Sequence, residues 1–348
     1  MALANITSPH AHSNKTTSWV MFQVILAMVP GIAALTIVFG YGNLINAVFA
    51  SIMCVGFEAL FVWLRRRPIA FYIRDGSAIV TGMLIGISFP PYAPFWVIVI
   101  ASCFAIMLVK HLYGGMGYNP FNPAMSAYVV MQVSLPVYMT QWAAPLGVQN
   151  AAVQSVGFMD ALKHNFTWRP YLEGYIDSYT MATPLDILKQ NESLTLAELH
   201  QQYEAFGMVG GLGWEWVNLA FLVGGCYLLA RRIFTWHAPV AMLLALALLS
   251  LINYQGGGSD SGGSVLFHLF SGATMVGAFF IVTDPVTSAT SNYGRFIYGF
   301  CIGVLVYIIR VWGGFPEALA FAVLLMNFCA PLIDQYTRPK TYGHGDRS

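Results

Sequence analysis

The chain has 348 residues, of which 57% are hydrophobic and only 9% are charged, and its formal net charge at pH 7 is +1. Soluble domains carry about 25% charged residues, so the composition excludes an ordinary soluble protein, and the near-zero charge gives no reason to expect a nucleic-acid partner. The 5 cysteines stand apart from one another inside apolar runs. This excludes a disulfide framework, a CxxC metal site and a local iron–sulfur motif.

The hydropathy pattern predicts an all-α polytopic membrane protein with about ten transmembrane helices. A regular spanning helix needs about 20 apolar residues, and fewer if it is broken or partly buried. The candidate segments are 20–40, 44–64, 77–89, 94–110, 123–135, 214–231, 237–253, 264–283, 295–312 and 316–334.

The third and fifth of these segments are too short to cross a membrane alone, and both adjoin proline-rich stretches, "SFPPYAP" and "YNPFNPA". Irregular backbone at membrane depth is tolerated only where protein or a cavity surrounds it. Each stretch is therefore either a candidate site in a broken helix or a proline kink packed by neighbouring helices.

The basic residues predict the orientation of the chain. If both termini are cytoplasmic, twelve of the sixteen Lys and Arg fall on the inner side and four on the outer side, as the positive-inside rule requires. The predicted divisions are a cytoplasmic N-terminus (1–19), a first five-helix group (20–135), a loop outside the cytoplasm (136–213), a second five-helix group (214–334) and a cytoplasmic C-terminus (335–348).

The two five-helix groups resemble each other in sequence. "VTGMLIGISFPP" (80–91) is similar to "MVGAFFIVTDPV" (275–286) at an offset of 195, which pairs Gly82 with Gly277 and Pro90 with Pro285. A group with an odd number of spans forces the next group to enter the membrane from the opposite side. Unless the similarity is due to chance, it predicts two inverted repeats, whose sites lie near the repeat interface.

The outer loop, 136–213, contains a candidate helix start at Thr183. Pro184 follows it at the first helical position, and Asp186 stands at the third. The simplest interpretation is that Thr183 caps a short helix, which contributes roughly 1 kcal/mol.

A second interpretation of Thr183 starts with the residues before it. Asp177, Thr180, Ala182 and Thr183 are spaced as in the acceptor motif for covalent flavinylation, Asp-x-x-Ser/Thr-Gly-Ala-Thr, although Met181 replaces the glycine. In that chemistry, a magnesium-dependent flavin transferase outside the cytoplasm joins FMN to the final threonine through a phosphoester. We therefore expect either a helix cap or a flavin attachment site.

A second copy of the motif's last four letters, "SGAT" (271–274), shows that the letters alone decide little. It has Gly272 where the loop has Met181, but His268 stands where the acid should be. It also falls inside the predicted span 264–283, where a soluble transferase would not reach Thr274. Small residues there favour close helix packing instead.

Two long stretches resemble a known family. The run "SGATMVGAFFIVTDPVTSATSNYGRFIYGFCIGVLVYIIRVWGGFPEALAFAVLLMNFCAPLIDQYTRP" and "GGMGYNPFNPA" are similar to the D subunit of the bacterial Rnf complex. That protein is homologous to the B subunit of the sodium-pumping NADH:quinone oxidoreductase. The resemblance implies ten spans in two inverted halves.

The resemblance also implies a location and partners. The expected complex lies in the bacterial inner membrane and moves electrons between ferredoxin and NAD, coupled to Na⁺ or H⁺ transport. The partners would be the A, B, C, E and G subunits of the Rnf complex, and a flavin transferase would act during maturation. Both termini would be cytoplasmic, and the loop 136–213 would be periplasmic.

Two flavin cofactors follow from the same resemblance. It implies FMN on Thr183 and riboflavin near the "NPFNP" break, where Asn119 and Asn122 stand in the matching positions. A flavin ring needs hydrogen-bonding groups at its edge and apolar walls at its faces, and both asparagines can donate and accept hydrogen bonds. The structural alternative is that they cap the broken helix.

Three acids are candidates for ion coupling, because ionisable groups inside a membrane are usually functional. They are Glu58, Asp75 and Asp284, and their oxygens suit a hard cation. Asp284 has the alternative of capping the following turn or pairing with Arg295, and Asp75 that of pairing with Arg74.

The sequence shows no nucleophile–base arrangement, no Walker loop and no Rossmann fingerprint, so we expect no resident metal and no complete catalytic site on this chain. The redox chemistry would belong to the cofactors. The competing class is a ten-helix transporter or channel without a redox cofactor, because inverted repeats with broken helices suit a solute pathway equally well.

Overall fold

The computed structural model describes residues 15–146, 148, 156–167, 180–191, 193–258, 261–315 and 317–338, and no strand occurs within them. The first half contains α1 (Thr17–Phe39), α2 (Gly42–Leu64), α3 (Ile69–Ile73), α4 (Ser77–Ser88), α5 (Phe95–Cys103), the π-helical η1 (Phe104–His111), α6 (Pro123–Ser134) and α7 (Pro136–Thr140). The loop contains α8 (Phe158–Phe166), α10 (Pro184–Gln190) and α11 (Leu196–Gln202).

The second half contains α12 (Trp214–Ala230), α13 (His237–Ile252), η2 (Gln255–Gly257), α14 (Val265–Phe270), α15 (Thr274–Val276), the π-helical η3 (Gly277–Ile281), α16 (Asn292–Trp312) and α17 (Leu319–Tyr336). By length and composition, α1, α2, α16 and α17 can each cross a membrane, and four shorter apolar helices accompany them. Each predicted segment coincides with a helix or a group of consecutive helices. The all-α polytopic membrane class is confirmed.

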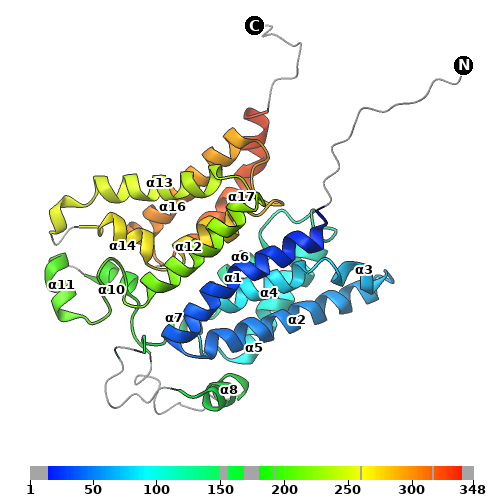
Figure 1. Cartoon of the computed structure of the whole chain (residues 1–348), viewed down its shortest axis with the longest axis horizontal. Coiled ribbons are helices and arrows are strands. Elements are labelled where there is room, and N and C mark those ends of the chain that lie inside the picture. Colours follow the sequence, from blue (N-terminus) through cyan, green and yellow to red (C-terminus); the bar gives the residue numbers. More distant parts are fainter. Residues whose placement is uncertain are drawn as a thin grey trace, which may run out of the picture.

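The two halves are related by antiparallel packing of equivalent helices. At the offset of 195, α12 corresponds to α1, and the two lie side by side along most of their length (Figure 1). Trp19 near the start of α1 lies under the Arg231 guanidinium at the end of α12, while Val38 near the end of α1 contacts Gly213 before α12. The helices therefore run in opposite directions, as inverted repeats require. The equivalent α6 and α17 also pack together across the halves.

Within the first half, small residues allow two helices to touch along their backbones. A Cβ added at Gly86 of α4 would lie 2.3 Å from Cα of Ala47 in α2, and one added at Gly82 would lie 2.4 Å from Cα of Ser51. Close approach at small residues is how helices gain packing energy where no water drives them together. The glycines therefore fasten α4, which is too short to be stable alone, to the long α2.

Both halves contain helix breaks whose polar backbone groups are satisfied by buried asparagines. Asn43 donates to the Phe89 carbonyl over 3.1 Å, and Asn46 donates to the Pro90 carbonyl over 2.9 Å, between α4 and α5. Asn218 donates to the carbonyls of Phe270 and Gly272. Free backbone groups cannot remain unpaired inside a membrane protein, so these side chains hold the breaks open.

The break at Gly272 corrects one expectation. The segment 264–283 is not one helix: α14 ends at Phe270, and Gly272 has φ +62°, a left-handed conformation that suits glycine. The small residues of "SGAT" therefore interrupt the helix, rather than only bringing helices together.

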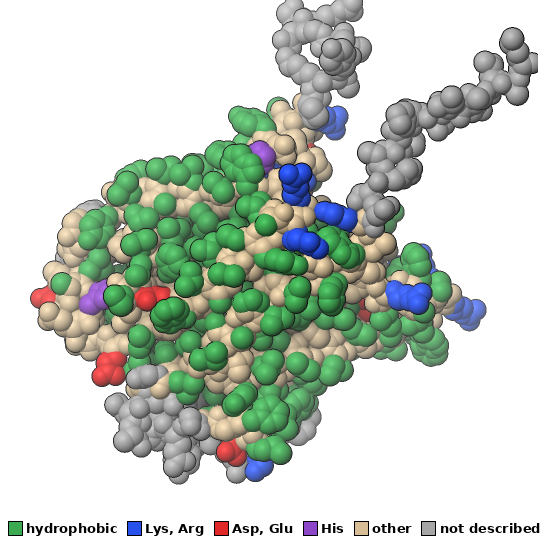
Figure 2. All heavy atoms as spheres, in the orientation of Figure 1, with side chains coloured by type: hydrophobic (Ala, Val, Ile, Leu, Met, Phe, Trp, Pro, Cys, Tyr) green, Lys and Arg blue, Asp and Glu red, His purple; other side chains and the backbone are tan. Residues whose placement is uncertain are grey.

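Charged side chains gather at the two ends of the molecule. Figure 2 shows a broad apolar surface, with most visible Lys and Arg at the end where α1 begins and α12 ends, and Asp and Glu toward the opposite end. We call these the termini end and the loop end. Contacts between distant segments confirm the grouping: Lys15 Nζ donates to the Arg231 carbonyl over 3.2 Å, and Ser18 donates to the Arg74 carbonyl over 2.7 Å.

Candidate functional site

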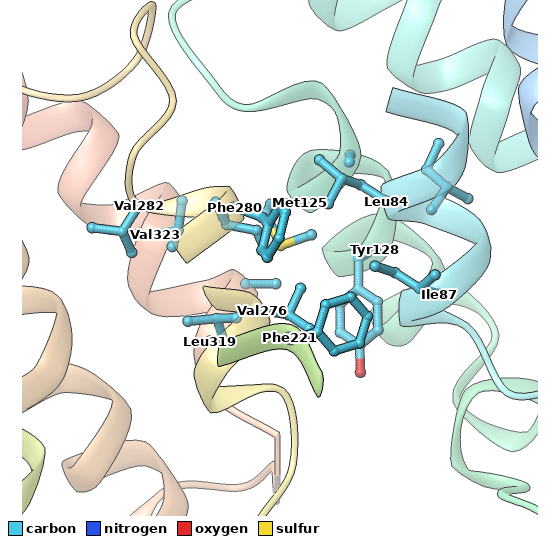
Figure 3. Packing of buried hydrophobic residues seen from close by; sticks show 14 of the residues in the cluster. Leu84, Ile87, Met125, Tyr128, Phe221, Val276, Phe280, Val282, Leu319 and Val323 are labelled. Atoms are coloured by element: carbon cyan, nitrogen blue, oxygen red, sulfur yellow. The ribbon is translucent and has the colours of Figure 1, made fainter. Parts of the chain in front are cut away.

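Two cavities lie between the halves, one toward each end. The cavity at the termini end measures about 750 Å³, and the cavity at the loop end about 80 Å³. Buried apolar side chains pack in the region between them (Figure 3), and of these Leu84 and Phe280 line the larger cavity, while Met125 and Phe221 line the smaller one. The molecule therefore carries two polar-edged cavities with an apolar layer between them.

The larger cavity brings together residues of the proline-rich stretch "YNPFNPA" and of the turn after η3 in the second half. Asn119, Asn122 and Asp284 all line it, together with Lys110 and Arg295. Because Asp284 comes from the second half, this cavity lies at the repeat interface, where an inverted-repeat protein is expected to have its site.

Asn122 has both of its polar atoms engaged. Its Oδ1 accepts a hydrogen bond from the Met125 backbone N–H over 3.1 Å and so caps α6. Its amide nitrogen donates to Oδ2 of Asp284 over 3.2 Å. The capping alternative is thus confirmed for Asn122. Asn119 donates to the Phe121 carbonyl over 3.0 Å and faces the cavity from the loop before the helix.

Asp284 shapes the turn that follows η3. One carboxylate oxygen accepts from the Val286 N–H over 3.2 Å, and the other accepts from the Thr287 hydroxyl over 2.9 Å. The turn-capping alternative is confirmed. Pairing with Arg295 is not found, because that side chain donates instead to the Ala289 carbonyl and the Thr235 hydroxyl.

Glu58 is an ion-pair partner in a buried polar network. Its Oε1 lies 2.5 Å from Lys110 Nζ and 2.9 Å from His111 Nε2, and the side chains of all three are at least 97% buried. Lys110 also donates to the Ser77 hydroxyl over 2.7 Å, and that hydroxyl donates to Asp75 over 2.6 Å. Two of the three predicted acids therefore belong to one network, which reaches the larger cavity through Lys110 and Ser77.

Asp75 has a local role at the start of α4. Its Oδ1 accepts from the Ser77 backbone N–H over 2.8 Å as well as from the Ser77 hydroxyl. A carboxylate in this position satisfies an otherwise unpaired N–H of the first helical turn. Asp75 is thus a helix-start residue that also connects to the charged network.

Thr183 caps α10 in a complete capping box. The Asp186 N–H donates to Thr183 Oγ1 over 3.3 Å, and the Thr183 N–H donates to Asp186 Oδ2 over 3.2 Å. The Thr183 hydroxyl also donates to Asp186 Oδ2 over 2.5 Å. Both residues line the smaller cavity, so the capped helix begins at its rim.

The rest of the predicted acceptor motif is described in part. Asp177 lies outside the described residues. Thr180 forms an isolated β-bridge with Ala143, and the Met181 N–H donates to the Trp142 carbonyl over 3.0 Å. Ala182 is exposed. The backbone before Thr183 is therefore tied to the segment after α7, and the position next to the acceptor faces solvent.

The second copy of the motif has a very different environment. Thr274 has no exposed surface, and its hydroxyl donates to the carbonyls of His268 and Ser271, each over 2.9 Å. Thr183 is only partly buried. The expectation that Thr274 is inaccessible is confirmed, because its hydroxyl serves the helix break.

Sequence reasoning missed several residues of these sites. From the sequence, Lys110 was used only in the count of basic residues on the inner side, and His111 was not singled out. Two adjacent ionisable residues next to a glycine-rich break could have indicated a functional site. Arg310 lies 3.3 Å from Glu317 near the smaller cavity. Gln132 lines that cavity, is 5% exposed, and its Oε1 has no hydrogen-bond partner among the described residues.

Comparisons with known proteins cover nearly the whole chain. Residues 4–343 match the NQR2, RnfD, RnfE family. The D subunit of an ion-translocating oxidoreductase complex from Cellvibrio japonicus (strain Ueda107) is 56% identical over 99% of this chain and 96% of its own length. Proteins of the same name from Pseudomonas aeruginosa (strain LESB58) and Aliivibrio salmonicida (strain LFI1238) are 52% and 47% identical, each over 99% of this chain and over 97% and 99% of their own lengths. With this coverage and identity, the chain belongs to the NQR2, RnfD, RnfE family.

Proposed function

We propose that this chain is the flavin-bearing membrane component of an ion-translocating electron-transfer complex acting on the ferredoxin/NAD couple. It carries FMN covalently on Thr183 and riboflavin in the larger cavity. The observation that carries the proposal is the contrast between two threonines. Thr183 stands partly exposed in an acceptor motif at the rim of a cavity, while Thr274 in the second "SGAT" has no exposed surface.

The larger cavity fits a riboflavin. Its volume of about 750 Å³ is within the range of roughly 300–1,000 Å³ that small-molecule sites occupy. Trp236, Phe279 and Phe280 supply aromatic walls, and Asn119 supplies hydrogen-bonding groups for a ring edge. Because the Asn122 side chain already caps α6 and bridges to Asp284, it would position the lining rather than hold the ring alone.

The smaller cavity fits only part of an FMN. Its volume of about 80 Å³ is below the usual size of a ligand pocket, so most of an FMN on Thr183 would lie outside the cavity unless its lining moves. The bound flavins would supply the electron-transfer chemistry, and this chain would supply position and electrostatics.

Among the three acids, Asp284 is the best candidate for ion coupling. Its carboxylate lines the larger cavity beside the Thr287 hydroxyl, and oxygen groups of this kind bind hard cations. The charge of Glu58 is already balanced by Lys110, and Asp75 acts at a helix start. An ion that enters the larger cavity would not pass freely to the smaller one, because the apolar layer lies between them.

We place the chain in the bacterial inner membrane, with the termini end in the cytoplasm and the loop 136–213 in the periplasm. The segregation of Lys and Arg to the termini end supports this orientation (Figure 2). Because relatives are named as the D subunit of an ion-translocating oxidoreductase complex, the expected partners are the A, B, C, E and G subunits, and a flavin transferase during maturation.

The test is covalent flavin. The full-length chain is co-expressed with a flavin transferase and denatured, and its flavin fluorescence is measured after electrophoresis. The wild-type and Thr274→Val bands should fluoresce, whereas the Thr183→Val band should not. A wild-type band without flavin, or a fluorescent Thr183→Val band, would overturn the assignment. Solute flux through the purified chain, with no flavin bound, would favour the transporter alternative.

A further inference from the structure

The described part of the outer loop contains two threonine–carboxylate capping boxes, and they lie in different surroundings. In the box of α11, the Thr195 hydroxyl donates to Glu198 over 2.8 Å, and the Glu198 side chain is exposed while Thr195 is partly buried. In the box of α10, the Thr183 hydroxyl donates to Asp186 over 2.5 Å, and both side chains are partly buried. The two boxes cap their helices in the same way. Capping alone therefore does not explain why the carboxylate of the α10 box is partly buried, while that of the α11 box is exposed.

The α10 box opens on the smaller cavity, and that cavity contains an unsatisfied polar atom. Gln132 lines it with an Oε1 that has no partner among the described residues, although the side chain is 5% exposed. Leaving a buried polar group unpaired is energetically costly. An atom of this kind indicates that the cavity beside Thr183 receives a polar ligand, independently of the capping geometry.

Attachment of a flavin nucleotide to Thr183 requires its hydroxyl to lose a proton. The donor would be a flavin dinucleotide. The Thr183 oxygen forms a bond to the flavin-side phosphorus, the bond between that phosphorus and the bridging oxygen breaks, and adenylate leaves. Kinases meet the same need with an aspartate that accepts the proton of the substrate hydroxyl.

We propose that Asp186 is the general base for its own chain's flavinylation. It accepts the Thr183 hydroxyl proton as the phosphoester forms and then releases that proton to water. The inference rests on the proposed FMN attachment. Its physical basis is the hydrogen bond already in place between the reacting oxygen and the carboxylate, which removes the need for the transferase to bring a base to this side of the acceptor.

The experiment uses the purified full-length chain, a purified flavin transferase, a flavin dinucleotide and Mg²⁺, and follows the rate of covalent labelling between about pH 6 and pH 9. Asp186→Asn keeps an oxygen that caps α10 but accepts no proton. We expect it to be labelled about 100-fold more slowly at neutral pH, with a rate that rises with pH, whereas the wild-type rate stays flat. Asp186→Glu should restore part of the rate.

The second capping box supplies the matched control. Glu198→Gln makes the same chemical change in α11 and should leave the labelling rate unchanged. Hydrogen exchange at the Ile187 amide, which donates to the Thr183 carbonyl over 3.0 Å, reports whether α10 is intact in the variant. A wild-type rate in Asp186→Asn, or a slow rate with the wild-type pH profile, would overturn the role of Asp186. A wild-type chain that takes no label would instead overturn the FMN attachment, and the inference with it.

Discussion

The side-chain amide of Asn122 donates a hydrogen bond to Oδ2 of Asp284 over 3.2 Å, and it joins two helix breaks that lie 162 positions apart in the sequence. One break belongs to each half of the molecule, and both line the larger cavity. The contact is therefore a physical link between the inverted halves, at the place where we expect a ligand.

Replacing Asn122 with alanine should destabilise the protein by about 2–4 kcal/mol. The change removes a helix cap, which contributes about 1 kcal/mol, and leaves the Asp284 carboxylate with one donor fewer, which costs about 1–3 kcal/mol. The measurement is denaturant unfolding in detergent. Asn119→Ala is the control, because it loses only a hydrogen bond to the Phe121 carbonyl. Equal losses in the two variants would contradict a special role for Asn122.

Glu58→Gln should destabilise the chain by about 3–5 kcal/mol, because it leaves the buried Lys110 ammonium without its countercharge. Combining it with Lys110→Met should recover part of that loss. The exposed pair of Asp160 and Lys163, 3.9 Å apart, is the matched control, and Asp160→Asn should change stability by about 0–1 kcal/mol. The measurement is a double-mutant cycle. If the double variant is no more stable than Glu58→Gln, the pair does not act as described.

Gly86→Ala should loosen the contact between α4 and α2. The new Cβ would meet the Ala47 backbone at 2.3 Å, and overpacking of this kind costs about 1–3 kcal/mol. Gly56→Ala is the control, since a Cβ there meets nothing within 4 Å, and alanine favours a helix by about 0.5–1 kcal/mol. Thermal unfolding in detergent should separate the two. A stable Gly86→Ala variant would show that the helices can move apart freely.

The α11 capping box should weaken in acid. The Thr195 backbone N–H and hydroxyl hold the pKa of Glu198 below its ordinary value of 4.5. A carboxylate with a lowered folded-state pKa contributes stability above its unfolded value and loses it as the pH falls through the folded value. Hydrogen exchange at the Leu199 amide, which donates to the Thr195 carbonyl, should therefore quicken, relative to the intrinsic exchange rate, as the pH falls below about 4.5. Glu198→Gln should remove this dependence, and a dependence that persists would contradict the assignment.

Most of the helices were predictable, because an apolar run long enough to cross a membrane has few other structures open to it. The breaks near Pro90 and Pro120 were predictable for the same kind of local reason, since proline cannot continue a helix. The break at Gly272 was not, because no proline marks it, and the Asn218 side chain that stabilises it lies 52 and 54 positions from the carbonyls it serves.

The sequence indicated which residues were candidates, but it did not indicate which residues they contact. Glu58 and Asp284 were notable as acids in apolar surroundings, but the sequence does not show that Lys110 neutralises the first and that Asn122 contacts the second. For Thr183 the sequence predicted both a cap and an attachment motif. The structure confirms the cap and shows the adjoining cavity.

The sequence by itself determined that the chain lies in a membrane, that it is helical, and that its halves repeat with opposite orientation. The first two properties follow from composition and segment length, which can be read from each stretch of the sequence by itself. The opposite orientation follows from the odd number of spans in each half. Only the tertiary structure decided which polar groups meet: Glu58 with Lys110 across 52 positions, and Asn122 with Asp284 across 162. Such contacts form only when helices from distant segments pack together. Because burying an unpaired polar group costs free energy, the packing that is adopted is one that brings these groups together.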